Sequence, residues 1–473
     1  MSEMRHDLLL RTIKLGNAVL MTLPFAAAWM LFYGHQLYLE PFFFKGNWLV
    51  IVLYFLVYAM YGRVYDAFLV SLNPISEMVY SQSLAAAVSD VIAFIVIWLL
   101  MRYFPSILPM LIVFGAQVAV STAWSVIVHK WYFRTFPPKR TIVVYDMREG
   151  MEELIAEYGL SKKFKVEKII PVDDCIKEGL SNLKAAEAVY LCGIHSRERN
   201  IILKHCIKEG ITVYVIPRIG DILMSGAKKM HMFHLPVMRV DRYSPPPEYV
   251  FVKRLIDILV SLVMLLIFSP VMLITAAAIW VEDRGPVFYK QCRLTKDGKK
   301  FNVLKFRSMR TDAERDGVAR LSSGKDDDRV THVGKVIRKY RIDELPQLLN
   351  VLSGSMSLVG PRPERPEIAA QYEEELPEFS LRLQAKAGLT GLAQVYGKYN
   401  TSPYDKLQMD LMYIVSPSIL EDLRIIFATV KIVFMPESTE GNWCSRESLP
   451  KRGKRRSDVR LHFSISSEYV SLH

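Results

Sequence analysis

Long stretches without charge constrain the fold of this chain more than any other feature. Four apolar runs lie within residues 1–135, and Asp90 is the only Asp, Glu, Lys or Arg inside them. Three of the runs approach the ~20 residues that a membrane-spanning helix needs, and the second must extend through Pro41–Phe44 or past Arg63. A single uncharged helix can be the core of a soluble protein, but four so close together predict a four-helix transmembrane bundle. The runs are Leu15 to Tyr33, Trp48 to Tyr61, Leu84 to Met101 and Ser106 to Val128.

The distribution of charge predicts how the bundle is oriented. The net charge of the 473-residue chain is +12. Basic residues precede the first run and follow the fourth, whereas the loop between the first two runs has Lys45 as its only Lys or Arg. Because cytoplasmic ends of spanning helices are rich in Lys and Arg, both ends of the bundle are expected in the cytoplasm, facing anionic lipids of the inner leaflet. The first run is long for a signal peptide. Five cysteines without CxxC spacing argue against a zinc site or a disulfide framework.

After Pro137-Pro138 the pattern changes to short apolar strands that alternate with amphipathic helices. This alternation predicts a parallel α/β sheet. A dinucleotide-binding fold would place G-x-G-x-x-G after the first strand, but the sequence there is DMREG. Residues 136–244 are therefore predicted to form a Rossmann-like module with a structural or regulatory role. Its helices are expected at about 150–158 and 196–209, and its strands at Thr141–Tyr145, Phe164–Pro171, Ala188–Cys192 and Thr212–Pro217.

A fifth uncharged segment, Ile258 to Val281, follows a run of three prolines. Basic residues flank it on both sides, so the charge bias predicts no direction of crossing. Ser269-Pro270 lies near its middle, and proline removes a backbone donor and clashes with the preceding turn. A helix at about 255–282 that breaks there has two halves of roughly 18 Å, enough to enter one leaflet and return. The freed carbonyls would need cover from Ser269 or from neighbouring protein. The alternative is a kinked spanning helix.

The segment YRIDELPQLLNVLSGSMSLVGPRPE combines residue types that suit phosphate chemistry. Asp343 and Glu344 are adjacent carboxylates. A carboxylate can accept a phosphoryl group covalently, and Mg²⁺ prefers one or two carboxylates together with phosphate oxygens. Arg362 stands between Pro361 and Pro363, whose rings stiffen the turn, and a guanidinium can hold phosphate oxygens bidentately. A solvated acidic pair is the bland alternative. With the membrane segment nearby, the pattern predicts phosphate chemistry at a lipid surface.

From Lys253 to about Ile432 the chain resembles the polyprenyl-phosphate hexose-1-phosphate transferases, also called monotopic phosphoglycosyl transferases. Where that family often has proline, this chain has Ala387. The bundle and the middle module also resemble the long members, the undecaprenyl-phosphate galactose and glucose phosphotransferases, by architecture rather than by motif. The matching stretches are KRLIDI (253–258), GPVFYKQCR (285–293), KFRSM (305–309), DELPQLLNVLSGSMSLVGPRPE (343–364) and GLTGLAQVYG (388–397).

The resemblance implies a reaction. The family moves a sugar 1-phosphate from a UDP-sugar to undecaprenyl phosphate and releases UMP, as the first step of exopolysaccharide, capsule or O-antigen synthesis. Asp343 would be the nucleophile and form a covalent aspartyl-phosphosugar, and Glu344 would assist together with Mg²⁺. UDP-sugars are cytoplasmic, so the enzyme would lie in the bacterial inner membrane as a multi-pass protein with its catalytic domain in the cytoplasm. Long relatives also suggest a homodimer.

The fold that the resemblance implies has three parts. An α-helical membrane bundle (1–135) and a Rossmann-like α/β module (136–244) precede a mainly α-helical monotopic catalytic domain (250–435), which contains the re-entrant membrane helix. Residues 436–473 are expected to be a disordered basic tail that touches lipid headgroups. No signature of a nucleic-acid-binding module is present, so no nucleic-acid partner is expected.

Further residues are expected near the substrates. Lys305 and Arg307 are candidates for phosphate binding, with an interfacial basic face as the alternative. Gly388, Thr390 and Gly391 belong to a predicted turn in which the backbone approaches the uridine or the phosphates.

Another group is expected at the membrane. Lys253, Arg254 and Asp257 lie where the chain meets the bilayer, and anchoring to headgroups and contact with substrate are equally compatible with them. Ser269 and Pro270 match the helix break of the family.

Two other functions are compatible with parts of the chain. A membrane-bound nucleotide-sugar dehydratase or epimerase also joins four helices to a Rossmann domain, but it needs G-x-G-x-x-G and a Tyr-x-x-x-Lys base. The glycine pattern is missing here, and the region after 250 would have no role. A non-catalytic scaffold for polysaccharide assembly would not need Asp343-Glu344. No residue discriminates among the possible sugars or indicates the final polysaccharide.

Overall fold

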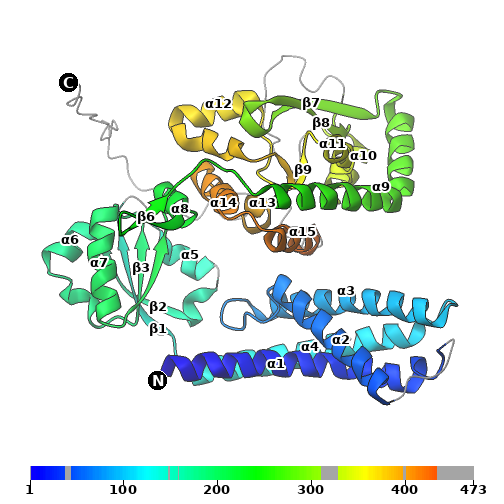
Figure 1. Cartoon of the computed structure of the whole chain (residues 1–473), viewed down its shortest axis with the longest axis horizontal. Helices are drawn as coiled ribbons and strands as arrows, with labels where there is room; N and C mark the ends of the chain where they lie inside the picture. The colour runs from blue at the N-terminus through cyan, green and yellow to red at the C-terminus, as the bar shows by residue number, and fades with distance from the viewer. Residues whose placement is uncertain are drawn as a thin grey trace.

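The computed structural model describes residues 2–37, 44–146, 150–157, 159–310, 329–397 and 401–433, so the predicted basic tail lies outside the described residues. The N-terminal part is a bundle of four long helices that lie side by side (Figure 1). Its core is aromatic, with Phe25 stacked on Tyr54 at 4.0 Å between ring centroids. The second helix begins at Phe44 and extends past Arg63 to Val64, which gives it the length that a membrane-spanning helix needs. The helices are α1 (Ser2–Ala28, continued by the π-helical turn η1, Trp29–Tyr33), α2 (Phe44–Val64), α3 (Ile75–Met101) and α4 (Leu108–Thr135).

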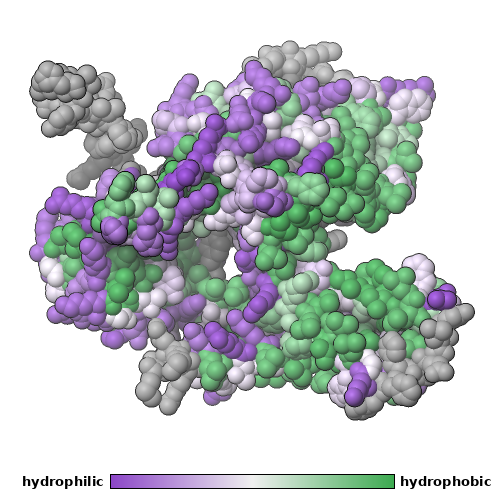
Figure 2. All heavy atoms as spheres, viewed as in Figure 1, coloured by the Kyte–Doolittle hydropathy of each residue, from purple (hydrophilic) through white to green (hydrophobic). Residues whose placement is uncertain are grey.

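The outer surface of the bundle is apolar. Large side chains such as Leu99 and Ile127 are 71% and 65% exposed, and Figure 2 shows a largely hydrophobic surface over the bundle and over α9 (Pro247–Asp283). Contiguous apolar surface of this extent is unfavourable in water and indicates contact with lipid. Within the described residues, five helices, α1 to α4 and α9, are long and apolar enough to cross a membrane. The chain is therefore suited to a membrane location.

The middle of the chain forms a four-stranded parallel sheet in the order β2-β1-β3-β4. All four predicted strands are confirmed, because apolar β-branched runs such as Ile142–Val144 fill the core of the sheet. The strands are β1 (Lys139–Tyr145), β2 (Phe164–Pro171), β3 (Ala188–Cys192) and β4 (Thr212–Ile216). The helices are α5 (Met151–Glu157), η2 (Leu160–Lys162), α6 (Val172–Lys177), η3 (Ser181–Leu183), α7 (Ser196–Lys208) and α8 (Ile219–Ser225).

Two features of this part had no counterpart in the prediction. A hairpin of β5 (Lys228–Met232) and β6 (Leu235–Arg239) follows α8. The buried side chains Ile219 and Ile222 of α8 belong to the core of the third region rather than to that of the parallel sheet. The middle module therefore packs against the third region through α8.

The third region surrounds a compact core that includes Leu348, Val351 and Leu411. It contains an antiparallel hairpin and a short parallel pair of strands among helices. After α9 the elements are β7 (Phe288–Leu294), η4 (Lys296–Gly298), β8 (Lys300–Phe306), α10 (His332–Lys339), η5 (Ile342–Glu344), α11 (Gln347–Ser353), β9 (Ser357–Val359), α12 (Pro366–Glu375), η6 (Pro377–Gln384), β10 (Gly388–Thr390), α13 (Leu392–Tyr396), α14 (Pro403–Val415) and α15 (Ile419–Val433).

The predicted break in α9 is a bend. The helix continues through Ser269 and Pro270 as one element, and Figure 1 shows it turning sharply before it reaches β7. Proline is one of the few recognised causes of sharp bends in helices. The hydroxyl of Ser269 donates to the Leu266 carbonyl at 2.8 Å, which is the carbonyl that a backbone N–H at position 270 would have bound. Ser269 therefore supplies the expected cover and keeps the helix continuous. Whether α9 re-enters one leaflet stays a prediction.

Helix α15 joins the third region to the bundle. Arg424 pairs with Asp66 at 3.3 Å and Lys431 pairs with Glu77 at 2.9 Å. The ring of Phe427 meets Tyr61 edge to face, with centroids 5.0 Å apart. The third region, which contains the predicted site, therefore contacts the bundle at the end of α2 and the start of α3.

Candidate active site

Asp343 and Glu344 lie in the short 3₁₀ turn η5, between α10 and α11. Arg341 precedes this turn with φ at +54°, a left-handed conformation that costs an ordinary residue about 1–3 kcal/mol and persists only where the surroundings enforce it. Pro346 follows at the start of α11. The two carboxylates are therefore held in a tight turn with a restricted backbone.

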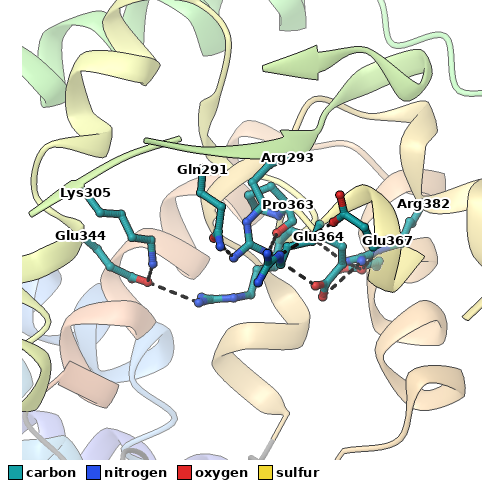
Figure 3. Close-up of polar contacts among 11 residues, drawn as sticks. Gln291, Arg293, Lys305, Glu344, Pro363, Glu364, Glu367 and Arg382 are labelled. Atoms are coloured by element: carbon teal, nitrogen blue, oxygen red, sulfur yellow. Dashed lines mark hydrogen bonds and ion pairs between the residues drawn. The ribbon is translucent and has the colours of Figure 1, made fainter. Parts of the chain in front are cut away.

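Glu344 lies between two cations. Lys305 on β8 donates to its Oε1 at 2.9 Å, and Arg362, in the turn after β9, donates to the same oxygen at 3.3 Å (Figure 3). Burial acts to raise the pKa of Glu344, but the charges of Lys305 and Arg362 outweigh it and hold that pKa below the usual carboxyl range. The structure thus brings together three of the predicted residues and keeps Glu344 ionised.

Asp343 is in a different environment. It forms no hydrogen bond or ion pair with any other residue that the structure describes, although it is partly buried. Burial, reinforced by the negative charge of Glu344, raises the pKa of Asp343 above its usual value. Environments that shift the pKa values of two neighbouring carboxylates in opposite directions are typical of groups with different chemical roles. Asp343 is the carboxylate left available to a substrate.

A network of buried charges holds the Arg362 turn from behind. Arg382 Nη2 donates to the Arg362 carbonyl at 2.9 Å, and the same guanidinium pairs with Asp410 at 2.6 Å and with Glu364 at 3.6 Å. Arg382 and Asp410 are 3% and 1% exposed. Arg293 on β7 donates to the Pro363 carbonyl at 3.3 Å (Figure 3). Pro361 and Pro363 therefore stiffen a turn that side chains from three other segments also fix.

Sequence reasoning missed most of this network. Arg293 and Glu364 lay inside stretches that resemble the family, and that was the signal that could have found them. Arg382 and Asp410 belong to no matching stretch, and no spacing relates them. Their partnership depends on η6 packing against α14.

The predicted glycine turn is a short strand. β10 pairs with β9, and Gly360 N–H donates to the Thr390 carbonyl at 2.9 Å. A β-carbon at Gly388 or Gly391 would overlap the backbone of Gly360. These glycines are therefore needed for backbones to approach each other beside the Arg362 turn. Contact of Gly388, Thr390 and Gly391 with substrate stays a prediction.

Arg307 lies apart from the Glu344 group. It is 6% exposed and pairs with Asp283 at the end of α9. Its guanidinium fills the space beside Gly285, where a β-carbon would overlap it. The structure therefore uses Arg307 to join the end of β8 to the end of α9, and its role in phosphate binding stays a prediction.

The residues expected at the membrane surface point inward. Asp257 accepts hydrogen bonds from Ser357 Oγ and Leu358 N at 2.8 and 3.0 Å. Arg254 donates to the Val351 and Leu352 carbonyls at the end of α11, and Lys253 pairs with buried Asp422 at 3.0 Å. These three side chains fasten α9 to the rest of the region, and their contact with headgroups or substrate stays a prediction.

The acidic pair offers a limited set of metal ligands. No group of three or more His, Cys, Asp or Glu side chains suited to a metal occurs within the part of the chain that the structure describes. Two adjacent carboxylates fit Mg²⁺ when a substrate adds phosphate oxygens, because this ion is commonly bound by one or two carboxylates and a phosphate. The residues present fit a metal that binds together with its substrate.

Comparison with known proteins identifies the relatives. Residues 248–436 match the bacterial sugar transferase family. A UDP-N-acetylgalactosamine-undecaprenyl-phosphate N-acetylgalactosaminephosphotransferase of Aeromonas hydrophila is 40% identical over 234 residues, which is 49% of this chain and 54% of that protein. A UDP-glucose:undecaprenyl-phosphate glucose-1-phosphate transferase of Klebsiella pneumoniae is 44% identical over 191 residues, 39% of this chain and 41% of that protein. The chain thus spans about half the length of these two relatives or less.

A third relative is covered more fully. A UDP-glucose:undecaprenyl-phosphate glucose-1-phosphate transferase of Caulobacter vibrioides is 42% identical over 183 residues, which is 38% of this chain and 68% of that protein. The residues that match the family, 248–436, include the Asp343–Glu344 turn and the Arg362 loop. By these matches, the chain belongs to the bacterial sugar transferase family.

Proposed function

We propose that this chain transfers a hexose 1-phosphate from a UDP-sugar to undecaprenyl phosphate, releases UMP, and so primes the synthesis of an exopolysaccharide, capsule or O-antigen. The names of the relatives support the acceptor and the class of reaction. The observation that carries the proposal is the difference between the two carboxylates of η5: Glu344 is ion-paired with Lys305 and Arg362, whereas Asp343 has no such partner among the residues that the structure describes. Membership of the family favours this reaction over the dehydratase and scaffold alternatives.

The proposed chemistry proceeds in two displacements. A carboxylate oxygen of Asp343 attacks the sugar-side phosphorus, an Asp–O–P bond forms, and the bond from that phosphorus to UMP breaks. An oxygen of undecaprenyl phosphate then attacks the same phosphorus, and the Asp343 carboxylate leaves. Splitting one difficult displacement in two is the advantage of covalent catalysis. Lys305 and Arg362 supply positive charge where phosphate charge accumulates.

Mg²⁺ belongs to the proposal because the donor carries a charged pyrophosphate. Asp343 and Glu344 would hold the ion with phosphate oxygens of the donor, and when bound it would offset negative charge during attack. Glu344 is suited to this role because its ionised state is stabilised by its two cationic neighbours.

The placement of the site at a membrane is also part of the proposal. Phe251, Leu266 and Leu273 of α9 are 71%, 77% and 72% exposed, which favours a lipid environment for this helix. A re-entrant α9 in the inner membrane would keep both of its ends in the cytoplasm, where the donor is. Cysteines placed just before Ile258 and just after Val281 should then be labelled from the same side. Labelling from opposite sides would contradict the re-entrant arrangement.

The decisive experiment omits the acceptor. Purified protein given a panel of UDP-sugars with Mg²⁺ should release UMP and retain a sugar-phosphate adduct that mass spectrometry places on Asp343. Asp343→Asn should show neither. Asp297→Asn, the same change at an exposed residue of η4 that pairs with Arg242, should behave as the wild type does. An adduct on another residue, or turnover by Asp343→Asn, would refute the nucleophile. A homodimer stays an expectation that light scattering in detergent tests.

A further inference from the structure

The bundle contains a group of hydrogen-bonded polar side chains in its apolar core. Asp90 on α3 is 4% exposed, and its Oδ1 accepts a hydrogen bond from the Tyr54 hydroxyl on α2 at 2.7 Å. Gln117 on α4 donates from its side-chain nitrogen to the same hydroxyl at 2.7 Å and to the Met21 carbonyl on α1 at 3.1 Å. All four helices, which lie side by side in Figure 1, therefore contribute to one polar group.

No positive charge compensates Asp90. It takes part in no ion pair with any residue between 2 and 433 that the structure describes, and the side chain that donates a hydrogen bond to it is that of Tyr54. The other titratable group beside this cluster is Tyr58 of α2, and α1 and α4 present Asn17 and Gln117. An ionised carboxylate in such surroundings costs several kcal/mol unless a counter-charge is present. The neutral acid avoids this cost.

The assignment of the hydrogen atoms of Tyr54 and Gln117 also favours a neutral Asp90. The single Tyr54 hydroxyl hydrogen goes to Asp90 Oδ1, and the two amide hydrogens of Gln117 go to Tyr54 and Met21. Asp90 Oδ2 and Gln117 Oε1 are then left as buried acceptors without a donor among the described residues. An ionised Asp90 leaves both without a donor, whereas a protonated carboxyl supplies one O–H donor at the atom that lacks a partner.

A neighbouring layer of the bundle provides the contrast. Tyr58 donates to Asn17 at 2.9 Å, and Asn17 and Ser121 donate to Gln82 Oε1 at 3.2 and 2.8 Å. Gln82 in turn donates to the Ala67 carbonyl at 3.1 Å. These side-chain contacts need no ionisable acid. In this layer each of the acceptors Asn17 Oδ1, Gln82 Oε1 and the Ala67 carbonyl has a donor, whereas Asp90 Oδ2 and Gln117 Oε1 have none among the described residues.

We propose that Asp90, together with Tyr54 and Gln117, forms a proton-binding site in the centre of the bundle, in which the carboxyl is protonated and neutral at neutral pH. The ligand is a proton, and the site is separate from the residues of the transfer reaction. Because the folded bundle keeps this proton, whereas an unfolded Asp loses it above about pH 4, the stability that the site contributes is lost as the pH rises from that value.

Infrared spectroscopy of the full chain in detergent tests this proposal directly. At pH 7 the wild-type spectrum should contain a band of a protonated carboxyl that shifts in D₂O and is lost in Asp90→Asn. Asp90→Leu, which removes the same carboxyl with an apolar side chain, provides the same difference spectrum if Asp90→Asn does not accumulate. Asp7→Asn is the matched control, since Asp7 lies on α1 with a largely exposed side chain, and it should lose no such band.

A second measurement follows the stability. The thermal midpoint of the wild type relative to Asp90→Asn should fall as the pH is raised, because only the wild type can lose the proton. If neither variant loses a protonated-carboxyl band, Asp90 is ionised and another donor, such as a trapped water, satisfies its oxygens. That result would overturn the proposal, as would identical pH profiles for the two proteins.

Discussion

The bundle and the third region, which contains the candidate active site, both bury polar side chains, but in different ways. The third region buries opposite charges next to each other, as in Arg382–Asp410 and Lys253–Asp422. The bundle buries uncharged donors and acceptors, such as Tyr58 and Asn17, with one isolated acid. Charged side chains are expensive in a lipid environment and useful where phosphates must be held. Each region therefore buries the kind of polar group that its surroundings permit.

The largest effect is expected where a buried charge loses its partner. Arg382→Ala leaves Asp410 buried without a counter-charge and should lower the free energy of unfolding by about 3–5 kcal/mol, measured by denaturant titration in detergent. Arg239→Ala breaks an exposed pair with Asp241 and should cost about 0–1 kcal/mol. The double change Arg382→Met/Asp410→Leu should recover part of the loss. Equal effects of the two single changes would contradict the idea that burial makes the loss of a charge partner costly.

The next effect concerns the two carboxylates of η5. The wild-type rate of adduct formation should rise with pH as Asp343 loses its proton, over a range above that of an ordinary Asp because burial and Glu344 raise its pKa. Glu344→Gln removes one of these causes, so the pKa of Asp343 should fall and the acid limb should move to lower pH. Glu367→Gln, at an exposed position, should leave the limb in place. A shift to higher pH in Glu344→Gln would contradict the coupling.

A smaller effect is expected in the bundle. Tyr58→Phe removes one uncharged hydrogen bond to Asn17 and should cost about 0.6 kcal/mol, the average for such bonds between membrane helices. Thermal unfolding in detergent measures it, with Tyr103→Phe as the control because that hydroxyl is exposed. If Tyr58→Phe cost as much as Arg382→Ala, neutral and charged networks would not differ as proposed.

The smallest effect is expected at the bend of α9. Ser269→Ala leaves the Leu266 carbonyl without the donor that replaces the missing N–H of Pro270, and should cost less than about 0.5 kcal/mol because the bond is exposed. Thr122→Ala is the control: the Thr122 hydroxyl also donates to a carbonyl of its own helix, that of Val118, but no proline follows it. Unfolding midpoints that rank the two changes in reverse order would show that Ser269 does not support the bend.

Much of the fold was predictable because it depends on local pattern. Four uncharged runs correspond to α1 to α4, and the predicted strands Phe164–Pro171 and Ala188–Cys192 match β2 and β3 at both ends. The motif assigned both Glu344 and Arg362 to phosphate chemistry, and the structure brings the two side chains within 3.3 Å of each other, while their roles toward a substrate stay a prediction. Spacing and residue type carried this information, since helix and strand periods repeat over a few residues.

Other features were decided only by tertiary structure. The sequence by itself determined which segments avoid water, which alternate as strands and helices, and which carboxylates accompany the arginine turn. It did not determine that Arg382, paired with Asp410, supports the Arg362 turn, that Lys253, Arg254 and Asp257 point inward, or that Asp90 lies in a layer without a cation. The sequence does not distinguish a charged residue that faces water from one that faces lipid or an ion-pair partner. Its partner is set by the path of the chain, which brings together residues whose separation follows no local period.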